Sequence, residues 1–493
     1  MVGERHRLSP IEIDQDEFRK IGYELIDTLA DFYSSIDQHP VTTGETPTQI
    51  KTLLGEEKLP EQGVPVSELL AKTSALLFNH SLFNGHPRFF GYITSSPTQI
   101  GALGDLLAAA VNPNVGANIL SPVATAIEKQ TVKWLAEFIG VSPGYSGLLV
   151  SGGNMANFTA FLAARTAKAP KSIKEDGLSG ASSKMVLYCS KATHTWIEKA
   201  AVLFGHGTNA IRWIPTDANN KMNTAALETS IKEDLEKSNH PFIVIGNAGD
   251  VSTGVVDDLA EISRISKLYG LWFHIDGAYG MPAAALPQCR SMFIGFDEAD
   301  SIALDPHKWL YAPLEAGCTL VKNPQHLIDT YSAHPVYYNF DHNADETSLN
   351  YYEYGFQNSR GFRALKVWLA LKQVGKAAYL NTIGEDITLS ELLFEEAKKH
   401  PELEAVSHNL SITTLRYVPL HYSMEKNDQE TYLNSLNEKL LNQLQEGGEV
   451  FLSNAVISGK YCLRACIVNY RTSEKDILET INVIVREGRK LIS

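Results

Sequence analysis

Short apolar runs recur along the middle of the chain and alternate with segments of helical periodicity. The apolar runs are predicted to be buried strands, at residues 148–150, 185–188, 211–214, 242–245, 273–275, 301–304 and 320–321. Helices are predicted between them at residues 155–168, 223–231 and 259–269, and before them at residues 121–138. Because strands and helices alternate from about residue 100 to about residue 330, the pattern predicts an α/β fold with a mostly parallel central sheet and helices on both faces.

The N-terminal part of the chain precedes this alternation. Apolar residues recur at steps of three and four within residues 10–38, which predicts an amphipathic helix. Residues 40–64 are acidic and rich in Pro, Gly and Thr, so they are predicted to be a connecting loop, and a second helix is predicted at residues 67–78. Because the first helix lies ahead of the α/β pattern, we expect an arm that packs on a second subunit, the alternative being a cover for the main body.

Two further segments complete the domain plan. Residues 86–96 combine Pro and Gly with paired aromatic residues and end in hydroxyl side chains, which suits an irregular pocket wall better than plain core packing. From about residue 378 onward, a helix, two short strands at 411–417 and 461–468, and a terminal helix predict a smaller α+β domain. The expected parts are an N-terminal helical arm at 1–98, a large cofactor-binding domain at 99–378 and a small domain at 379–493.

Composition limits the classes of function. Of 493 residues, 44% are hydrophobic and 20% are charged, as in an ordinary globular enzyme, and the net charge is −14. This charge argues against nucleic-acid binding and against a polybasic membrane anchor. The N-terminus lacks the apolar core of a signal peptide, and no apolar run is long enough to span a bilayer. The five cysteines are scattered and show no metal-site spacing, so we expect reduced thiols, no bound metal and a cytoplasmic protein.

The strands at residues 273–275 and 301–304 each lead to a chemically useful side chain. The first runs into Asp276, and the second runs through Asp-Pro-His into Lys308. The two residues are 32 positions apart, enough for one strand-helix-strand excursion that brings an acid and an amine to neighbouring strand ends. Alone, each would more often be a turn or surface residue. Together they predict a site for pyridoxal 5'-phosphate (PLP), which needs a lysine for its aldehyde and a carboxylate for its ring nitrogen.

Two weaker signals fit the same cofactor. An apolar strand enters the turn Ser151-Gly152-Gly153-Asn154, and a long helix leaves it, so free backbone N–H groups at the helix N-terminus could bind a phosphate. A plain turn that needs glycine is the alternative, and the nucleotide P-loop pattern is absent. His194 lies just past a predicted strand. It would stack on the cofactor ring, although a lone histidine there is more often a capping or core residue.

With these segments in order, the chain resembles the group II PLP-dependent amino-acid decarboxylases, which include aromatic-L-amino-acid, tyrosine, histidine and glutamate decarboxylases. The resemblance extends over nearly the whole chain. It rests on the order and spacing of His86-Pro87, Ser151-Gly152-Gly153, His194, Asp276 with Ala278, Pro306-His307-Lys308, and Arg360-Gly361-Phe362-Arg363-Ala364-Leu365-Lys366. It implies a fold-type I enzyme of the aspartate-aminotransferase kind, a PLP-dependent carboxy-lyase that acts on an amino acid as a homodimer with its active site at the subunit interface.

The resemblance also implies roles for individual residues. Lys308 would link covalently to PLP, Asp276 would pair with the ring nitrogen, and Ala278 and His194 would pack on the two faces of the ring. The phosphate would be held by Gly153 and Asn154 with His307 beside it, and the substrate wall would include Tyr92 and Ser95. Tyr337 falls where the mobile loop of the family carries the tyrosine that returns a proton to the substrate carbon, with Tyr338 as the alternative register.

Two departures from the family pattern stand out. Asn154 takes the place of a serine found in many members, which could alter the phosphate contacts slightly. Asp250-Val251 stands where many members carry two threonines, so a carboxylate replaces hydroxyls near the site. Asp250 is therefore a candidate cofactor-binding residue whose orientation the sequence leaves open.

The expected reaction is decarboxylation of an L-amino acid to an amine and CO₂. The aromatic wall and the lack of an obvious added basic residue favour an aromatic substrate over glutamate or histidine. An aldehyde synthase is the main alternative within the family, but Tyr337 favours simple decarboxylation because that branch commonly carries Phe there. An aminotransferase usually needs an arginine on the substrate α-carboxylate, and a non-catalytic homologue would not need the complete set of chemical residues.

Overall fold

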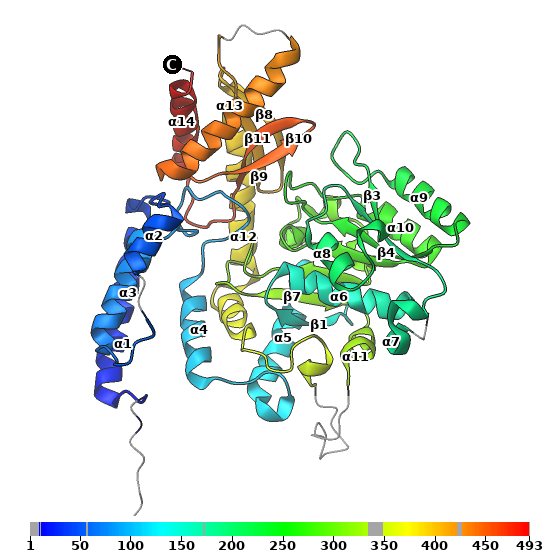
Figure 1. Ribbon diagram of the computed structural model, residues 1–493, viewed down its shortest axis with the longest axis horizontal. Helices are drawn as coiled ribbons and strands as arrows, with labels where there is room; N and C mark the ends of the chain where they lie inside the picture. Colours follow the sequence, from blue (N-terminus) through cyan, green and yellow to red (C-terminus); the bar gives the residue numbers. More distant parts are fainter. Residues whose placement is uncertain are drawn as a thin grey trace, which may run out of the picture.

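The computed structural model describes residue 9 and residues 11–55, 58–170, 173–333, 349–421 and 426–492. These residues form two sheets with their helices, and a group of N-terminal helices lies beside them (Figure 1). The larger sheet has seven strands and the smaller one has four. The long helix α12 (Ala364–Lys399) runs between the two sheets in Figure 1 and contacts elements of both parts.

The seven-stranded sheet has the order β1-β7-β6-β5-β4-β2-β3. Its strands are β1 (Ser146–Val150), β2 (Met185–Ser190), β3 (Ile211–Ile214), β4 (His240–Asn247), β5 (Trp272–Asp276), β6 (Ser301–Leu304) and β7 (Gly317–Val321). Only β7 runs against its neighbours β1 and β6, and the remaining pairs are parallel. The α/β class with a mostly parallel sheet is confirmed.

Helices cover both faces of this sheet because alternate strand residues point to opposite sides. On one face, α5 (Pro122–Ile139), α9 (Thr224–Glu236), α10 (Leu259–Tyr269) and α12 pack on residues such as Val244 and Ile275. On the other face, α6 (Gly153–Lys168), α8 (Trp196–Leu203) and α11 (Gln325–Tyr331) pack on residues such as Ile243 and Ile245. The sheet is therefore buried on both sides, as a mostly parallel sheet requires.

Two predicted connections differ from the structure. The excursion between β5 and β6 contains three short 3₁₀ helices, Met281–Ala285, Arg290–Phe293 and Phe296–Glu298, in place of the expected α-helix. Pro282 and Pro287 interrupt this segment and disfavour a continuous helix. The loop expected at residues 169–183 includes a short helix, α7 (Ile173–Asp176). Neither difference moves the strand ends, so β5 and β6 are adjacent and parallel as expected.

Three N-terminal helices, α1 (Gln15–Ser35), α2 (Pro47–Leu54) and α3 (Val66–His80), stand at the side of the molecule (Figure 1). The prediction of a loop over 40–64 is wrong for α2. Thr46 and Gln49 form a capping box with Pro47 at the first helical position, and this local signal starts the helix. The body proper begins with α4 (Gln99–Val111), which packs on α12.

The smaller sheet is antiparallel in the order β10-β11-β9-β8, with β8 (Leu403–Asn409), β9 (Ile412–Tyr417), β10 (Ser453–Ile457) and β11 (Lys460–Cys466). It packs against α12, α13 (Lys426–Gly447) and α14 (Glu474–Lys490). Helix α12 has non-helical backbone at Gly375, with a φ of 71°, close to the expected boundary at residue 378. The boundaries of the three parts stay a prediction.

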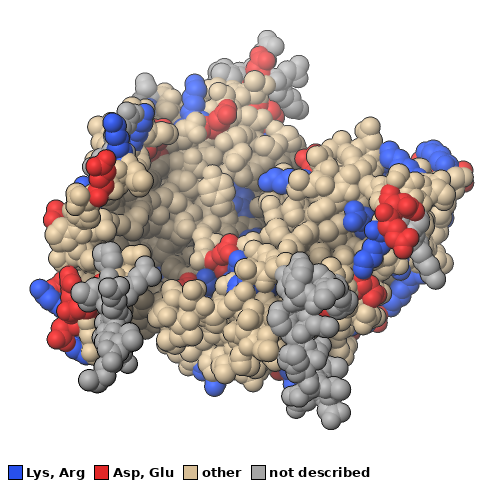
Figure 2. Space-filling view, turned by 60° about the horizontal axis from the view of Figure 1, so that its bottom comes forward, with Lys and Arg blue, Asp and Glu red and all other residues tan. Residues whose placement is uncertain are grey.

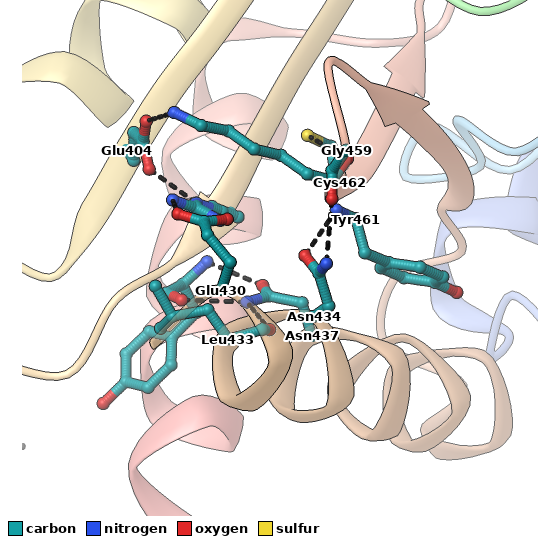
Figure 3. Close-up of polar contacts among 11 residues, drawn as sticks. Glu404, Glu430, Leu433, Asn434, Asn437, Gly459, Tyr461 and Cys462 are labelled. Carbon is teal, nitrogen blue, oxygen red and sulfur yellow. Dashed lines mark hydrogen bonds and ion pairs between the residues drawn. The ribbon is translucent and has the colours of Figure 1, made fainter. Parts of the chain in front are cut away.

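Two asparagines of α13 fasten this helix to the smaller sheet (Figure 3). Asn434 accepts a hydrogen bond from the backbone N–H of Tyr461 at 2.7 Å and donates to the carbonyl of Gly459 at 2.9 Å. Asn437 bonds both backbone groups of Tyr417 in the same way. These contacts satisfy backbone groups of β11 and β9 beyond the end of the ladder between these two central strands. They also fix β11, which carries a residue of the cavity described below.

Chemical features of the whole chain fit a folded globular protein. All five cysteines are buried and free, so none forms a disulfide. Across the described ranges, no helix combines the length and the apolar character that crossing a membrane requires.

Candidate active site

A cavity of about 530 Å³ lies where the parallel strands of the large sheet end. Its walls come from the residues that follow β1, β2, β4, β5 and β6, together with the segment at residues 92–94 and two strands of the smaller sheet. The carboxyl ends of parallel strands are the usual ligand site of such sheets. Figure 2 shows one face of the molecule hollowed at its middle, with acidic and basic side chains at the bottom and mostly uncharged walls.

Lys308 reaches this cavity from the loop after β6. Its side chain is 22% exposed, and its Nζ lies 3.2 Å from Oδ2 of Asp305, a carboxylate that is almost completely buried. His307 holds the loop in place because its Nδ1 accepts a hydrogen bond from the backbone N–H of Ala316 at 3.1 Å. The structure therefore presents an amine at the cavity wall with a buried counter-charge beside it.

Asp276 ends β5 and lies on the same cavity. Its Oδ2 accepts a hydrogen bond from the indole Nε1 of Trp196 at 2.7 Å, and its Oδ1 lies 3.3 Å from the backbone N–H of Ala278. Asn247 at the end of β4 is the neighbour of Asp276 in the strand register. The carboxylate is thus fixed by donors on both oxygens and stays 9% exposed toward the cavity.

His194 lies in the cavity wall beyond the end of β2. Its Nδ1 accepts a hydrogen bond from the backbone N–H of Trp196 at 3.3 Å. Partial burial lowers the pKa of the imidazole, an effect that the Lys308 ammonium reinforces and that Asp276 opposes. A neutral ring suits stacking on a flat cofactor.

The turn before α6 has the features of a phosphate cradle. Gly152 has a φ of 153°, which favours glycine, and α6 begins at Gly153 without a side-chain cap. The first residues of α6 line the cavity, where uncapped backbone N–H groups can bind an anion. A Cβ added at Gly153 would lie 2.7 Å from Oδ2 of Asp305 and 3.3 Å from the Cβ of Ala278. Only glycine allows this close approach. Asn154 lines the cavity one residue further along α6.

The residues present fit PLP. The cavity joins an amine, a fixed carboxylate, an imidazole and an uncapped helix N-terminus, which match the aldehyde, ring nitrogen, ring face and phosphate of that cofactor. Both carboxylate oxygens of Asp305 are buried without a hydrogen-bond partner, although Lys308 is within ion-pair distance. Lys308, Asp276, His194, Gly153, Asn154, Ala278 and His307 all lie on this one cavity, and their individual roles stay predictions.

Two further predicted residues, Asp250 and Tyr92, line the same cavity. Asp250 lines the cavity, but its own turn uses its oxygens, which accept hydrogen bonds from the backbone N–H groups of Ser252, Thr253 and Val255. Tyr92 lines the cavity with positive φ and is 61% exposed.

Ser95 does not line this cavity. Ser95 lines a neighbouring depression of about 250 Å³, and its hydroxyl donates to the backbone carbonyl of His307 at 2.9 Å. Ser95 therefore reaches the site through the loop that carries Lys308. Tyr337 and Tyr338 lie outside the described residues.

Arg464 of β11 lines the cavity and was missed in the sequence. Its Nη1 donates to the carbonyl of Tyr92 at 3.0 Å and to the hydroxyl of Ser453 at 2.9 Å, whereas its Nε and Nη2 are buried without a partner. A lone cation inside the apolar run from Tyr461 to Val468 was the available signal, because arginine is rarely buried without a partner.

Asp386 of α12 is hydrogen-bonded to residues that directly follow Lys308. Its Oδ2 accepts hydrogen bonds from the indole Nε1 of Trp309 at 2.8 Å and from the hydroxyl of Tyr311 at 2.6 Å. The carboxyl is fully buried, and burial raises its pKa to about 7. This group was also missed in the sequence, since a single acid in a long helix carries no local signal.

The raised pKa of Asp386 gives a stability prediction. The folded value of about 7 lies above the ordinary 3.8, so folded protein keeps a proton that unfolded protein releases, and the stability it contributes is lost as pH rises through 7. Asp386→Asn keeps an oxygen acceptor without the charge. Between pH 5 and pH 8 the wild type should lose about 2–3 kcal/mol of unfolding free energy that Asp386→Asn does not lose. The stability of the variant relative to wild type should therefore rise by that amount, as measured by urea unfolding at both pH values.

Asp234 supplies the matched control for this experiment. It is also buried, which raises its pKa, but hydrogen bonds from Arg212, Asn239 and Tyr188 outweigh burial and lower the pKa overall. Asp234→Asn is therefore expected to lose stability at both pH values. A pH-independent difference between Asp386→Asn and wild type would contradict the assignment of a neutral Asp386 below pH 7.

Comparisons with known proteins agree with this geometry. A family model described as the pyridoxal-dependent decarboxylase conserved domain matches residues 47–417. The aromatic-L-amino-acid decarboxylase of Bacillus atrophaeus is 34% identical over 470 residues, covering 95% of this chain and 95% of that protein. A phenylacetaldehyde synthase of a Rosa hybrid cultivar is 29% identical over 488 residues, covering 98% and 96%.

A solved structure shares the fold. The crystal structure of Oryza sativa TDC with PLP and tryptamine matches with a TM-score of 0.91 at 22% identity, covering 99% of this chain and 100% of that chain. The fold-type I architecture expected from the sequence is confirmed by this likeness. The match extends over the arm, the large sheet and the smaller sheet together.

Proposed function

The chain belongs to the pyridoxal-dependent decarboxylase family, and from this premise we propose that it converts an aromatic L-amino acid to the corresponding amine and CO₂. Its cofactor is PLP and its reaction class is amino-acid decarboxylation, as the sequence predicted. The main support for an aromatic substrate is the 34% identity to an aromatic-L-amino-acid decarboxylase, which covers 95% of both chains.

Bound PLP supplies an aldehyde that links to amines and a conjugated ring that accepts the electron pair left by CO₂. Lys308 holds the cofactor covalently, and Asp276 keeps a negative charge at the ring nitrogen. The N-terminus of α6 with Gly153 and Asn154 binds the phosphate, and His194 and Ala278 enclose the ring. The cavity geometry supports these roles because all of these groups line one space.

The substrate side of the cavity is partly aromatic. Tyr92 and Ile93 line it. The ring of Tyr92 lies 6.3 Å from that of Phe451, which stacks on Phe89 at 5.4 Å. Arg464 fixes the carbonyl of Tyr92. An apolar, aromatic wall favours a flat apolar side chain.

Arg464 supports a second candidate. Its buried guanidinium has two nitrogens without a hydrogen-bond partner. These nitrogens could bind the side-chain carboxylate of a substrate such as glutamate. The aromatic wall and the identity to an aromatic-L-amino-acid decarboxylase support the first candidate more strongly.

A panel assay tests the substrate. Purified protein with added PLP is incubated with each natural L-amino acid, and CO₂ and amine are measured separately. We expect the highest kcat/KM with an aromatic amino acid and one amine formed for each CO₂. Preference for glutamate would favour the second candidate, and CO₂ release from no amino acid would refute the proposal.

Because phenylacetaldehyde synthases are among the relatives, the product that contains the substrate nitrogen should be measured in the same reactions. A decarboxylase leaves the nitrogen in the amine, whereas an aldehyde synthase releases ammonia and peroxide. We expect no ammonia or peroxide above the amount that spontaneous oxidation gives. Ammonia in proportion to CO₂ would assign the chain to the aldehyde synthases.

We also propose that the enzyme is a homodimer. Helix α4 exposes four apolar side chains that are each at least 49% exposed, Leu103, Leu106, Leu107 and Val111. In Figure 1 the α1–α3 helices stand beside α4. A second copy would bury these surfaces. Sedimentation velocity distinguishes a dimer from the 54.3 kDa monomer.

A further inference from the structure

We propose that Trp196 is a positioning residue that holds the carboxylate of Asp276 in the orientation that the ring nitrogen of PLP requires. This inference rests on the proposed function, since it concerns how the chain prepares its cofactor site. Within the described part of the chain, the Trp196 indole is the one side chain that hydrogen-bonds to Asp276, at 2.7 Å.

The indole is held in a fixed orientation. Trp196 is completely buried, and its ring contacts Phe158, Phe161 and His274 edge to face at 5.9–6.5 Å. It is the first residue of α8, two positions after His194, whose Nδ1 accepts a hydrogen bond from the Trp196 backbone N–H. The same short segment therefore provides the imidazole that lines the cavity and the indole that donates to Asp276.

The nearby histidine does not perform this role. The ring nitrogens of His274 lie 2.7 Å from Oδ1 of Asn157 and 2.8 Å from Oγ of Ser301, so neither is free for Asp276. Burial also lowers the pKa of His274 to about 4, which keeps the ring neutral. His274 is therefore no cationic partner for Asp276, and the donors that contact this carboxylate are the neutral N–H groups of Trp196 and Ala278.

Desolvation makes such donors important. A carboxylate that is 9% exposed loses most of its hydration, and hydrogen bonds from fixed N–H groups replace it. The Trp196 indole occupies Oδ2, and the Ala278 N–H lies near Oδ1 at the cavity side. With Oδ2 occupied, the carboxylate cannot rotate freely, and Oδ1 keeps acceptor capacity for the protonated ring nitrogen.

The test removes the indole N–H and measures cofactor binding to the cofactor-free protein. Trp196→Phe keeps an aromatic ring and deletes the donor. Trp272→Phe is the matched control, because Trp272 is equally buried and donates its Nε1 to Oγ of Ser301 at 2.8 Å, away from Asp276. We expect the Kd for PLP to rise about tenfold or more in Trp196→Phe and less than about twofold in Trp272→Phe, with similar melting temperatures for both.

A double-mutant cycle separates positioning from general packing. If Trp196 acts through Asp276, then Trp196→Phe in an Asp276→Asn background should change the Kd for PLP by less than about twofold. An equal loss in both backgrounds, or equal losses in Trp196→Phe and Trp272→Phe, would overturn the inference.

Two provisions keep the result interpretable. If Trp196→Phe does not fold, benzothienylalanine at position 196 keeps the shape of tryptophan with sulfur in place of N–H, and the same tenfold loss is expected. If the wild-type protein does not bind PLP, the proposed function fails, whereas wild-type binding with unchanged binding in Trp196→Phe refutes only this inference.

Discussion

Lys308→Ala is expected to abolish turnover, with kcat at least about 10³-fold below wild type. The side chain is the amine that faces the cavity, and no other lysine lines that space among the described residues. Without it the cofactor has no covalent attachment. The measurement combines the amine-forming assay with borohydride reduction of the PLP-loaded protein, followed by peptide mapping to locate the attached cofactor.

A matched control shows that the effect is specific to the cavity. Lys322 is exposed, pairs with Glu298 at 3.3 Å and does not line the cavity, so Lys322→Ala should keep full turnover and the cofactor on residue 308. Reduction that attaches PLP to a different lysine of the wild-type protein would contradict the assignment. So would wild-type turnover in Lys308→Ala.

Loss of fold must be separated from loss of chemistry in this variant. Removal of Lys308 leaves Asp305, which is 1% exposed, without the cation at 3.2 Å. A buried carboxylate without its partner costs stability. Lys308→Arg keeps a positive charge near Asp305 but cannot link to the aldehyde, so we expect it to melt close to wild type and to be as inactive as Lys308→Ala.

The sequence predicted those parts of the candidate site that depend on residues close together in the chain. Asp276 and Lys308 each follow an apolar strand, and parallel pairing of β5 with β6 brings these strand ends together whatever the connection contains. The Gly152-Gly153 turn is local in the same sense. These features depend on residues next to one another in the chain, so patterns of a few residues reveal them.

Features that depend on distant segments could not be predicted in this way. Arg464 reaches the cavity from the smaller sheet, about 370 residues after Tyr92, whose carbonyl it binds. The link from Asp386 to Trp309 and the link from Trp196 to Asp276 are also set by packing between separate elements. Helix α2 is different, since its capping box at Thr46 and Gln49 was readable and the Pro/Gly content of the segment was given too much weight.

For Asp250 the sequence indicated a position near the site but not the role of the side chain. The sequence placed a carboxylate near the site, and the structure has it on the cavity wall. Its oxygens are occupied by the turn at residues 252–255, a use that acidic residues in tight turns often have. A side chain with its acceptors already in use has little capacity left for a cofactor.

Arg360 belongs to a buried ion pair that contacts β1, the strand that leads into the Gly152 turn. Its guanidinium is 2% exposed, the carboxylate of Glu128 is fully buried, and Nη1 lies 3.1 Å from Oε2. The pair also bonds the backbone of Leu149 in the edge strand β1: the N–H donates to Glu128 at 2.9 Å, and the C=O accepts from Arg360 at 2.6 Å. The Gly152 turn follows β1 directly.

Arg360→Met is expected to lower the free energy of unfolding by about 3–5 kcal/mol, because it leaves the Glu128 charge buried and the carbonyls of Leu149 and Val115 without this donor. Guanidinium unfolding of the cofactor-free protein measures this loss. Arg416→Met is the matched control. Arg416 is also buried, but its partners Glu404 and Glu430 are 34% and 53% exposed and can be hydrated, so its loss should cost only about 1 kcal/mol.

The double variant Glu128→Leu with Arg360→Met separates the charge from the backbone contacts. Removing both partners eliminates the buried unpaired charge, so we expect the double variant to be more stable than Arg360→Met by about 2 kcal/mol. It should stay below wild type, because the N–H and C=O of Leu149 still lack partners at the edge of β1. Additive losses would mean that the ion pair is not the stabilising unit. Recovery to wild-type stability would mean that β1 does not need these contacts.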